Sequence, residues 1–518
     1  MPLVLASCLG LGLFLGNILS SKGSFQNGSI GSEKYQKIQE IIEALDSKYV
    51  DQVNAEKLFE TTISDMLHQL DPHSNYIPAS ELKAMNESIE GKFGGIGVRF
   101  FIVHDTICVT HVIPNSPSQR AGLKAGDRFL QINGANVTGK KINNDKVMKL
   151  LKGTPNTKVN VILLRNGKRL KKQLVRGIIP IESISAAYMM DADHGYMKID
   201  QFSVTTYEEF KQAAFILKEK GLKHLILDLR DNGGGVLSSA TNIVDEFLGG
   251  KEIIVKTKGT HQREFVYASK PGGILSDVKL SVLINSNSAS ASEILAGAIQ
   301  DNDRGLIFGR RSFGKGLVQE DVPLRDGSNL RLTVARYYTP TGRCIQKPYD
   351  GNYDSYYDDQ NQRYNSGELY KPDTTKFVDS LKFKTPKGKT VYGGGGIMPD
   401  VFVPYDTMGM TWYLTSLRYS SAFQGFAFDY VYNRKHQWKN LNALKQQLQI
   451  NDALLNEFTA FAQKEARIPF DAYEFQQSKS LIKKYLKAEI ARQLFLEQGY
   501  FEVINEFDED IKRVLKQK

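Results

Sequence analysis

Cysteine and tryptophan are scarce in this 518-residue sequence, which contains three cysteines and two tryptophans. Because Cys8, Cys108 and Cys344 lie far apart, they predict neither a disulfide framework nor the paired thiols of a zinc site. The eight histidines include no H-E-x-x-H pattern and no close pair at ligand spacing. We therefore predict no metal, and no motif calls for another cofactor.

A concentrated positive charge is also missing. The net charge is +10, but 67 basic residues stand against 57 acidic ones and are scattered along the chain. The basic run at 168–172 lies on a predicted hairpin, where charged side chains are typical of a solvated strand edge. We therefore predict no nucleic-acid binding. The length indicates about two to four globular domains.

Long apolar runs are limited to residues 2–19, which carry no charge. A helix of this length is near the lower limit for spanning a bilayer, about 17 residues. The alternative is the apolar part of a signal peptide, although the usual basic start is missing. The motif at 5–8 resembles a lipoprotein box but has no apolar leader. We expect an exported protein on the periplasmic side of the inner membrane, anchored there by this segment.

Residues 279–320 predict a strand, a tight turn, a helix and a second strand. The alternation of Leu280, Val282 and Ile284 indicates a buried strand, and 293–300 has helical apolar spacing. The first turn of a helix has unpaired N–H groups and a partial positive charge, which stabilise an oxyanion. This corner suits a nucleophile, but turn and capping roles explain its serines equally well. Residue chemistry does not choose among Ser286, Ser288, Ser290 and Ser292.

A hydroxyl nucleophile needs a base, and Lys315 lies nearby between two glycines. Burial lowers a lysine pKa from about 10.4 toward about 7–8, whereas the alternative is an ordinary solvated lysine. Residues 309–315 also fit the phosphate-binding pattern G-x-x-x-x-G-K. However, Gly316 replaces the hydroxyl residue that binds magnesium, and 317–323 predicts a strand instead of a helix. The sequence therefore argues against a nucleotide site.

Three motifs together resemble the signature of the carboxy-terminal processing (tail-specific) proteases. They are Ser-Ala-Ser-Ala-Ser-Glu at 288–293, Ala-Gly-Ala-Ile-Gln-Asp at 296–301 and Phe-Gly-Lys-Gly-Leu-Val-Gln at 313–319. The resemblance implies that Ser290 is the nucleophile and Lys315 the general base. It also implies that Gln319 supports Lys315 and that Asp301 has a supporting role without taking part in the chemistry.

Two further strand–loop–helix units precede this stretch, with strands at 195–200 and 222–229. Three such units in a row predict an α/β core with a largely parallel sheet, whose catalytic loops gather at the carboxyl ends of the strands. The family resemblance implies a ClpP/crotonase-like core. It also implies an oxyanion hole that uses the N–H of Gly233 or Gly234, with Ala291 as the second donor.

Residues 91–178 resemble a PDZ domain of the bacterial protease type. The resemblance is carried by the glycine-rich turn at 94–97 and by Ala-Gly-Leu-Lys-Ala-Gly-Asp at 121–127, although an ordinary hairpin turn is the alternative for the first motif. Such modules bind an extended peptide as an added strand and hold its carboxylate with backbone N–H groups. The implied peptide-binding residues are Gly94, Gly95, Ile96 and Gly97, with Arg128 as a sensor of bound substrate.

The chain is thus predicted to be a multidomain α/β protein. Its parts are a membrane anchor or signal segment (1–23), a helical region (32–90), the PDZ domain (91–178), the protease core (179–346 and 387–404), a surface insertion (347–386) and a helical tail (405–518). The tail is read as a packing cap on the core, with a partner-docking domain as the alternative. Beside Pro72, His73 is expected to stabilise a turn.

The expected function is that of an exported serine endopeptidase that cleaves proteins or peptides presented by their carboxyl termini. The alternative is a noncatalytic protein that binds peptides or other ligands on the same fold. That alternative expects Ser290 or Lys315 to be replaced, and both residues are present. The sequence does not determine an oligomeric state.

Overall fold

The computed structural model describes residues 32–103, 105–139, 142–373, 378–432, 434 and 436–517. The predicted anchor or signal segment, residues 1–23, lies outside this part of the chain. Within the described residues, no helix combines the length and apolar character that a membrane span requires. The chain divides into two compact units, with the boundary between Leu70 and Asp71.

The first unit is helical in its described part. It contains α2 (Ser32–Lys48) and α3 (Ala55–His68), and these two helices contact each other. The side chain of Asn54 accepts a hydrogen bond from the Lys57 N–H, which pairs one of the free N–H groups at the start of α3. The second unit begins with the short strand β1 (Asn75–Ile77) and the helix α4 (Ala79–Glu90).

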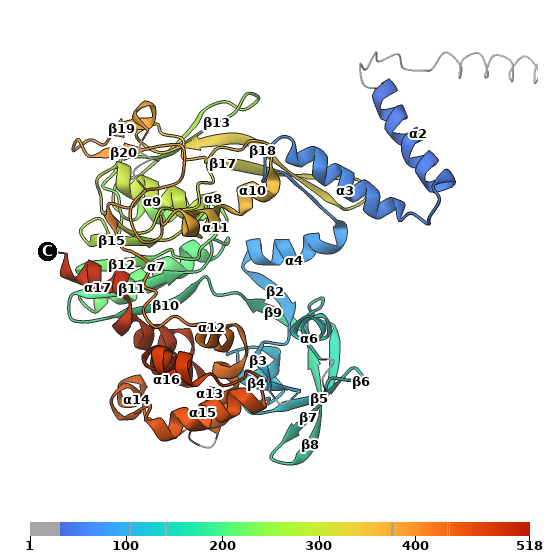
Figure 1. Ribbon diagram of the computed structural model, residues 1–518, viewed down its shortest axis with the longest axis vertical. Helices are drawn as coiled ribbons and strands as arrows, with labels where there is room; N and C mark the ends of the chain where they lie inside the picture. The colour runs from blue at the N-terminus through green and yellow to red at the C-terminus, as the bar shows by residue number, and fades with distance from the viewer. Residues whose placement is uncertain are drawn as a thin grey trace, which may run out of the picture. The chain divides into compact units, whose positions relative to one another are not determined.

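A six-stranded sheet is the framework of the second unit (Figure 1). Five of its strands run parallel, and β10 pairs antiparallel with β11. The order is β10 (Ile184–Met189), β11 (His194–Ile199), β12 (His224–Asp228), β15 (Lys279–Ile284), β16 (Leu306–Gly309) and β21 (Val401–Phe402). The predicted α/β core with a largely parallel sheet is therefore confirmed.

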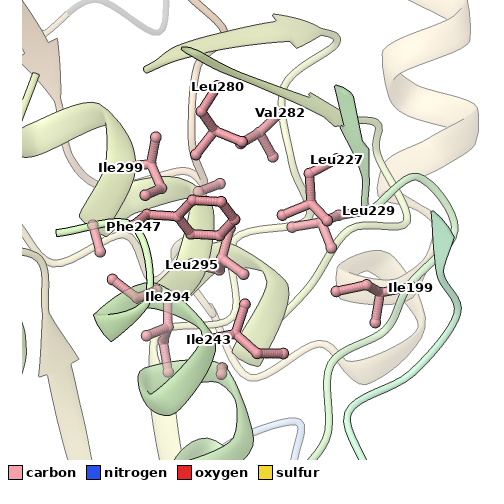
Figure 2. Close-up of a cluster of buried hydrophobic side chains, with 14 of the residues drawn as sticks. Ile199, Leu227, Leu229, Ile243, Phe247, Leu280, Val282, Ile294, Leu295 and Ile299 are labelled. Atoms are coloured by element: carbon pink, nitrogen blue, oxygen red, sulfur yellow. The ribbon is translucent and has the colours of Figure 1, made fainter. Parts of the chain in front are cut away.

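One face of this sheet packs against α7 (Thr206–Glu219), α8 (Leu237–Asp245) and α9 (Ala291–Asp301). Figure 2 shows part of this layer, in which Phe247 and Leu295 pack with Leu280 and Val282 of β15. Strand residues buried on both faces are typical of a parallel sheet covered on two sides. The near-continuous burial of β12 and β15 therefore requires a second covering layer.

The second layer comes from the end of the chain. In β12, Leu225 and Leu227 pack with the helices of the first layer, whereas Ile226 packs in the opposite layer with Ile511 and Val514. These last two residues belong to α17 (Glu509–Lys516), which therefore covers the second face of the six-stranded sheet. The rest of the helical tail has an apolar core of its own. Its helices are α12 (Trp412–Tyr419), α13 (Ala422–Tyr432), α14 (Leu441–Gln447), α15 (Asp452–Lys464) and α16 (Ala472–Ile504).

A second sheet is antiparallel and carries the strand that follows the Lys315 loop. Its strands are β1, β13 (Ile253–Lys258), β14 (Phe265–Ala268), β17 (Leu317–Pro323) and β18 (Asn329–Tyr338). β18 pairs with β1, β13 and β17. Because β1 directly follows the Asp71–Ser74 turn, this pairing fixes that turn near the start of β17.

The PDZ module is entered and left through paired strands, β2 (Lys92–Gly95) and β9 (Gly177–Pro180). Its sheet has β3 (Val98–Val103) at one edge, followed by β4 (Thr106–Val112), β5 (Arg128–Ile132), β7 (Lys158–Arg165) and β8 (Lys168–Val175), with β6 (Ala135–Asn136) beside β5. The helices are α5 (Pro117–Arg120) and α6 (Asn144–Leu151). Phe428 of α13 packs with Val103 and Cys108, so the helical tail also contacts this module.

The segment 347–386 is the predicted surface insertion, and most of its described residues are exposed. It contains α10 (Tyr353–Tyr357), α11 (Asp359–Asn365), a 3-10 turn (Asp379–Leu381) and β19 (Lys382–Lys384), which pairs with β20 (Thr390–Tyr392). Arg363 is only 2% exposed, and Tyr356 and Glu368 are also buried. These three side chains are exceptions in a mostly exposed segment, because their polar groups pair with loops of the core.

The fold predicts a large cost for breaking the ion pair at the end of α9. Asp301 and Arg343 are fully buried, with 2.7 Å between Oδ1 and Nη2. Removing one partner of such a pair leaves a buried charge, so we expect Asp301→Ala to lower the free energy of unfolding by about 3–5 kcal/mol. Urea denaturation followed by circular dichroism measures this loss.

The matched control is Asp379→Ala. Asp379 is 94% exposed and lies 3.9 Å from Lys382, so solvent screens the pair and no measurable change is expected. Equal stability of the two variants would contradict the role assigned to the buried pair.

Candidate functional site

Three loops leave the carboxyl ends of neighbouring parallel strands. They follow β12 (residues 229–236), β15 (residues 285–290) and β16 (residues 310–316). The backbone joins them directly, because Ala289 N–H donates to Asn232 O at 3.1 Å and Phe313 N–H donates to Ser288 O at 3.0 Å. The fold therefore brings together the three segments that carry the predicted catalytic residues.

The four serines of the β15–α9 corner have different surroundings. Ser288 Oγ donates to Leu229 O at 2.8 Å, and Ser292 Oγ donates to Asn232 O at 2.9 Å. Both of these side chains are fully buried. Ser286 lies earlier in the turn, whereas Ser290 is half-buried and immediately precedes α9. Ser290 and Glu293 form a capping box at the start of α9, and none of the hydrogen bonds among the described residues has Ser290 Oγ as its donor.

Ser290 has a strained backbone. Its φ is 54° and its ψ is −113°, in a region that residues with a side chain rarely adopt. A sharp, strained turn between strand and helix is the geometry that exposes a nucleophilic serine in other hydrolases. The strain is stabilised by hydrogen bonds on both sides, since Ser290 N–H donates to Glu293 Oε2 at 2.9 Å and Ser290 O accepts from Tyr337 at 3.3 Å.

Lys315 and Gln319 are in contact. Lys315 Nζ donates to Gln319 Oε1 at 2.8 Å, and the Gln319 amide nitrogen donates to the carbonyl of His73. Burial, together with the charge of Arg331, lowers the pKa of Lys315 from 10.5 to about 8, against the opposing charges of Asp71 and Glu293. Within the described residues, no hydrogen bond joins Lys315 Nζ to Ser290 Oγ.

Glu293 joins the two loops that carry these residues. Its Oε2 accepts from Ser290 N at 2.9 Å and from Lys315 N at 2.8 Å. The two backbone nitrogens therefore lie no farther apart than the sum of these distances, 5.7 Å. Its Oε1 accepts from Ser312 Oγ at 2.5 Å and from Gly314 N at 2.7 Å. Burial raises the pKa of Glu293 to about 7, and these four donors oppose that rise.

The glycine loop after β12 lies against Ser290. A Cβ atom on Gly234 would come within 2.8 Å of Ser290 Cβ and 2.9 Å of Ala291 N, and the φ of Gly234 is +101°. Gly234 N–H already donates to Asn232 Oδ1 at 2.8 Å. Among the described residues, the N–H groups of Gly233 and Ala291 have no acceptor. Of the two predicted glycine donors, Gly233 is therefore the one with a free N–H.

Asp301 lies at the opposite end of α9 from Ser290. At a rise of about 1.5 Å per residue, the helix separates them by about 16 Å. Its carboxylate accepts from Arg343 at 2.7 Å and from Thr341 Oγ1 at 2.6 Å, and so anchors the 339–343 turn. This position suits a supporting residue that does not contact the substrate.

The predicted peptide-binding residues of the PDZ module do not all lie together. Gly94 and Gly95 are in β2, and Ile96 and Gly97 form the turn into β3, an edge strand of the sheet. The tight turn at Gly97 has a φ of +78°, and a Cβ there would lie 2.3 Å from Ser116 Cβ. Arg128 instead starts β5, two strands away from β3.

Three contributions to the site were not predicted from the sequence. In the sequence, Glu293 stands out only as the last residue of the 288–293 motif. His73 was expected to stabilise a turn, and its N–H does donate to Asp71 Oδ1 at 2.8 Å, but its carbonyl also holds Gln319. Asp510 of α17 accepts from Arg230 and Arg310, at 2.8 and 2.7 Å, and so ties two catalytic loops to the end of the chain. Of the three, only Glu293 has a local sequence signal, because a glutamate three residues after a serine is the pattern of a helix capping box.

Models of known families match most of the chain. Residues 193–351 match the peptidase family S41, and residues 94–174 match the PDZ domain. Residues 17–80 match the N-terminal domain of the activating protease CtpB. Residues 413–496, in the helical tail, match a family of unknown function.

Curated relatives agree with these matches. A carboxy-terminal-processing protease of Bartonella bacilliformis is 38% identical over 59% of this chain and 71% of its own length. A probable CtpA-like serine protease of Staphylococcus epidermidis is 32% identical, over 62% of this chain and 66% of its own length. Among solved structures, a photosystem II D1 C-terminal processing protease is 31% identical, covers 60% of this chain and 89% of its own, and has a TM-score of 0.34. The chain therefore belongs to the carboxy-terminal-processing proteases of peptidase family S41 and is a serine peptidase.

Proposed function

We propose that this serine peptidase is an endopeptidase that uses a Ser290–Lys315 dyad and selects its substrates by their carboxyl termini. The observation that carries the proposal is the single Glu293 oxygen that accepts from both Ser290 N and Lys315 N. This shared acceptor keeps the two residues close together. The lowered pKa of Lys315, about 8, supports a base that is partly neutral near physiological pH.

In the proposed reaction, Ser290 Oγ attacks the carbonyl carbon of the scissile peptide while its proton passes to neutral Lys315 Nζ. The tetrahedral intermediate collapses to an acyl-enzyme, and the leaving amine takes the proton from Lys315. Water then attacks the ester carbon and gives a proton to Lys315. The bond between the acyl carbon and Ser290 Oγ breaks, Oγ takes the proton back from Lys315, and the carboxylic acid product leaves. Lys315 Nζ donates one N–H to Gln319 Oε1. In the proposed reaction, this hydrogen bond orients the amine so that its lone pair faces Ser290.

For the oxyanion, we infer two backbone donors, the N–H groups of Gly233 and Ala291. Both are free within the described residues, and Ala291 begins α9, where the partial positive charge of the helix favours an anion. For the substrate, we infer capture of the terminal carboxylate at the 94–97 turn and pairing of the tail with β3. The apolar run at 2–19 supports an exported enzyme on the periplasmic side of the inner membrane.

The dyad predicts that Ser290→Ala and Lys315→Ala each lower kcat/KM by about 10⁴-fold or more, since each removes an essential part of one unit. The substrate is a reporter peptide with an apolar, free carboxyl-terminal tail. Because only neutral Lys315 accepts a proton, wild-type kcat/KM should rise about tenfold per pH unit below pH 8 and level off above it. Unchanged cleavage by both variants would favour a noncatalytic role for the dyad residues.

The Gly234 contact predicts that Gly234→Ala lowers kcat by about 10²-fold, because the new methyl group displaces Ser290 or the oxyanion donors. Gly272→Ala is the matched control. Gly272 has the same φ of +101°, but a Cβ there meets nothing within 4 Å. Steady-state kinetics and thermal unfolding of both variants separate backbone strain from the effect on catalysis. A similar kcat for the two variants would argue against the proposed oxyanion site.

The PDZ assignment predicts that amidating the reporter's carboxyl terminus lowers kcat/KM by about tenfold or more, because a charge-assisted hydrogen bond is lost. Gly97→Ala should remove this preference for the free acid, since its Cβ collides with Ser116. Gly167→Ala is the control, with a comparable φ of +76° and nothing within 4 Å of the added Cβ. Equal rates for acid and amide in the wild type would place recognition elsewhere.

A further inference from the structure

We propose that residues 347–371, called the strap from here on, position the general base, and that Arg363 is the positioning residue. The inference rests on the proposed function, in which Lys315 accepts the proton from Ser290. The strap includes α10 and α11. The residue that it acts on is Lys315, which it reaches through the backbone of the 310–316 loop and not through the lysine side chain.

The central contact is between the Arg363 guanidinium and three successive carbonyl groups of that loop. Nη1 donates to Arg311 O at 2.8 Å, and Nη2 donates to Ser312 O at 3.0 Å and to Phe313 O at 3.4 Å. The strap backbone supplies a fourth donor, because Lys347 N–H donates to Gly314 O at 2.9 Å. Every carbonyl from 311 to 314 is thus paired with the strap.

The N–H groups of the same loop are paired with the catalytic core. Gly314 and Lys315 donate to Glu293 at 2.7 and 2.8 Å, and Ser312 donates to Ile397 O at 3.1 Å. The loop therefore has two sets of partners, one on each side. Gly314 has a φ of +93°, and a second glycine follows Lys315, so the loop has little conformational preference of its own. Its shape depends on these two sets of hydrogen bonds.

Ion pairs fix Arg363 itself. Asp359 lies 2.8 Å from Arg363 Nε and 3.3 Å from Lys347 Nζ, and Arg311 forms a bidentate pair with Glu368 at 2.5 and 2.8 Å. Arg363 and Glu368 are buried. The guanidinium is held by a carboxylate on its own helix and donates its remaining N–H groups to the loop. A buried planar fork of this kind is suited to fixing a backbone in one conformation.

The strap also contacts the other two parts of the site. The Gln360 side chain donates to Asn287 Oδ1, in the loop that carries Ser290. Tyr356 OH lies 3.0 Å from His73 Nε2, and Tyr357 OH donates to Pro72 O at 2.9 Å. These two tyrosines thereby hold the turn whose carbonyl accepts from Gln319. All three contacts are consistent with a segment that positions the dyad as a whole.

The test compares Arg363→Gln and Arg363→Lys with the wild type by the pH dependence of kcat/KM on the free-acid reporter. Without the Arg363 guanidinium, the 310–316 loop loosens and water reaches Lys315. Water stabilises the protonated amine, so the pKa of Lys315 rises. For Arg363→Gln, we expect the acid limb of the pH profile, the range in which kcat/KM rises with pH, to move up by about one pH unit. We also expect kcat at pH 7 to fall about 10²-fold, with a smaller change in KM. Arg363→Lys keeps the positive charge but not the planar pair of donors, so its pH profile and kcat should lie between those of the wild type and Arg363→Gln.

Arg304→Gln is the matched control. Arg304 also donates to carbonyls, those of Phe247, Leu275 and Val278 at 2.6, 2.8 and 2.5 Å, but it precedes β16, at the end of the sheet opposite the catalytic loops. Its loss should lower the unfolding temperature and leave the acid limb unchanged. If Arg363→Gln does not fold, Glu368→Gln tests the same idea more mildly, because it frees only Arg311 and should shift the limb in the same direction.

The outcomes separate this inference from the proposed function. If Lys315→Ala cleaves the reporter like the wild type, the proposed dyad is wrong and the strap has no base to position. If Lys315→Ala is inactive but folded Arg363→Gln and Glu368→Gln both keep the wild-type acid limb and kcat, the dyad stands and the positioning role of the strap is overturned. A shifted limb in the strap variants but not in Arg304→Gln supports the proposal.

Discussion

The site depends on one buried carboxylate. Glu293 lies three residues into the helix that begins after Ser290, and it accepts four hydrogen bonds from the two loops that carry Ser290 and Lys315. Burial of a charged carboxylate is costly unless donors surround it, and here the donors are backbone and hydroxyl groups of the active-site loops. The same hydrogen bonds that stabilise the carboxylate therefore hold the backbones of Ser290 and Lys315, the proposed nucleophile and base, close together.

The scaffold around this carboxylate is assembled from distant parts of the chain. Helices α7, α8 and α9 cover one face of the catalytic sheet, and α17, at the end of the chain, covers the other. Asp510 of α17 also receives hydrogen bonds from Arg230 and Arg310, which lie in two different catalytic loops. The helical tail is thus part of the peptidase core as well as a folded region with its own apolar cluster.

Much of the fold could be predicted from the sequence because its signals are local. The alternation of Leu280, Val282 and Ile284 and the helical spacing after Ser290 identify β15 and α9 without any knowledge of their neighbours. The segment 347–386 could not be placed in this way. Its tyrosines, aspartates and asparagines are typical of an exposed loop, and the partners that bury Arg363 and Glu368 lie in the 311–314 loop and are not encoded by local spacing.

The sequence by itself determined the order of strands and helices, the two glycine-rich turns and the residues available as nucleophile and base. Residue chemistry alone left four serines as candidates for the nucleophile, and only the family resemblance pointed to Ser290. The tertiary structure sets two of the four apart, because the hydroxyls of Ser288 and Ser292 donate to carbonyls of the loop after β12, more than fifty residues earlier in the chain. Hydrogen bonds between distant segments exist only once the sheet has formed, and for this reason no local pattern reveals them.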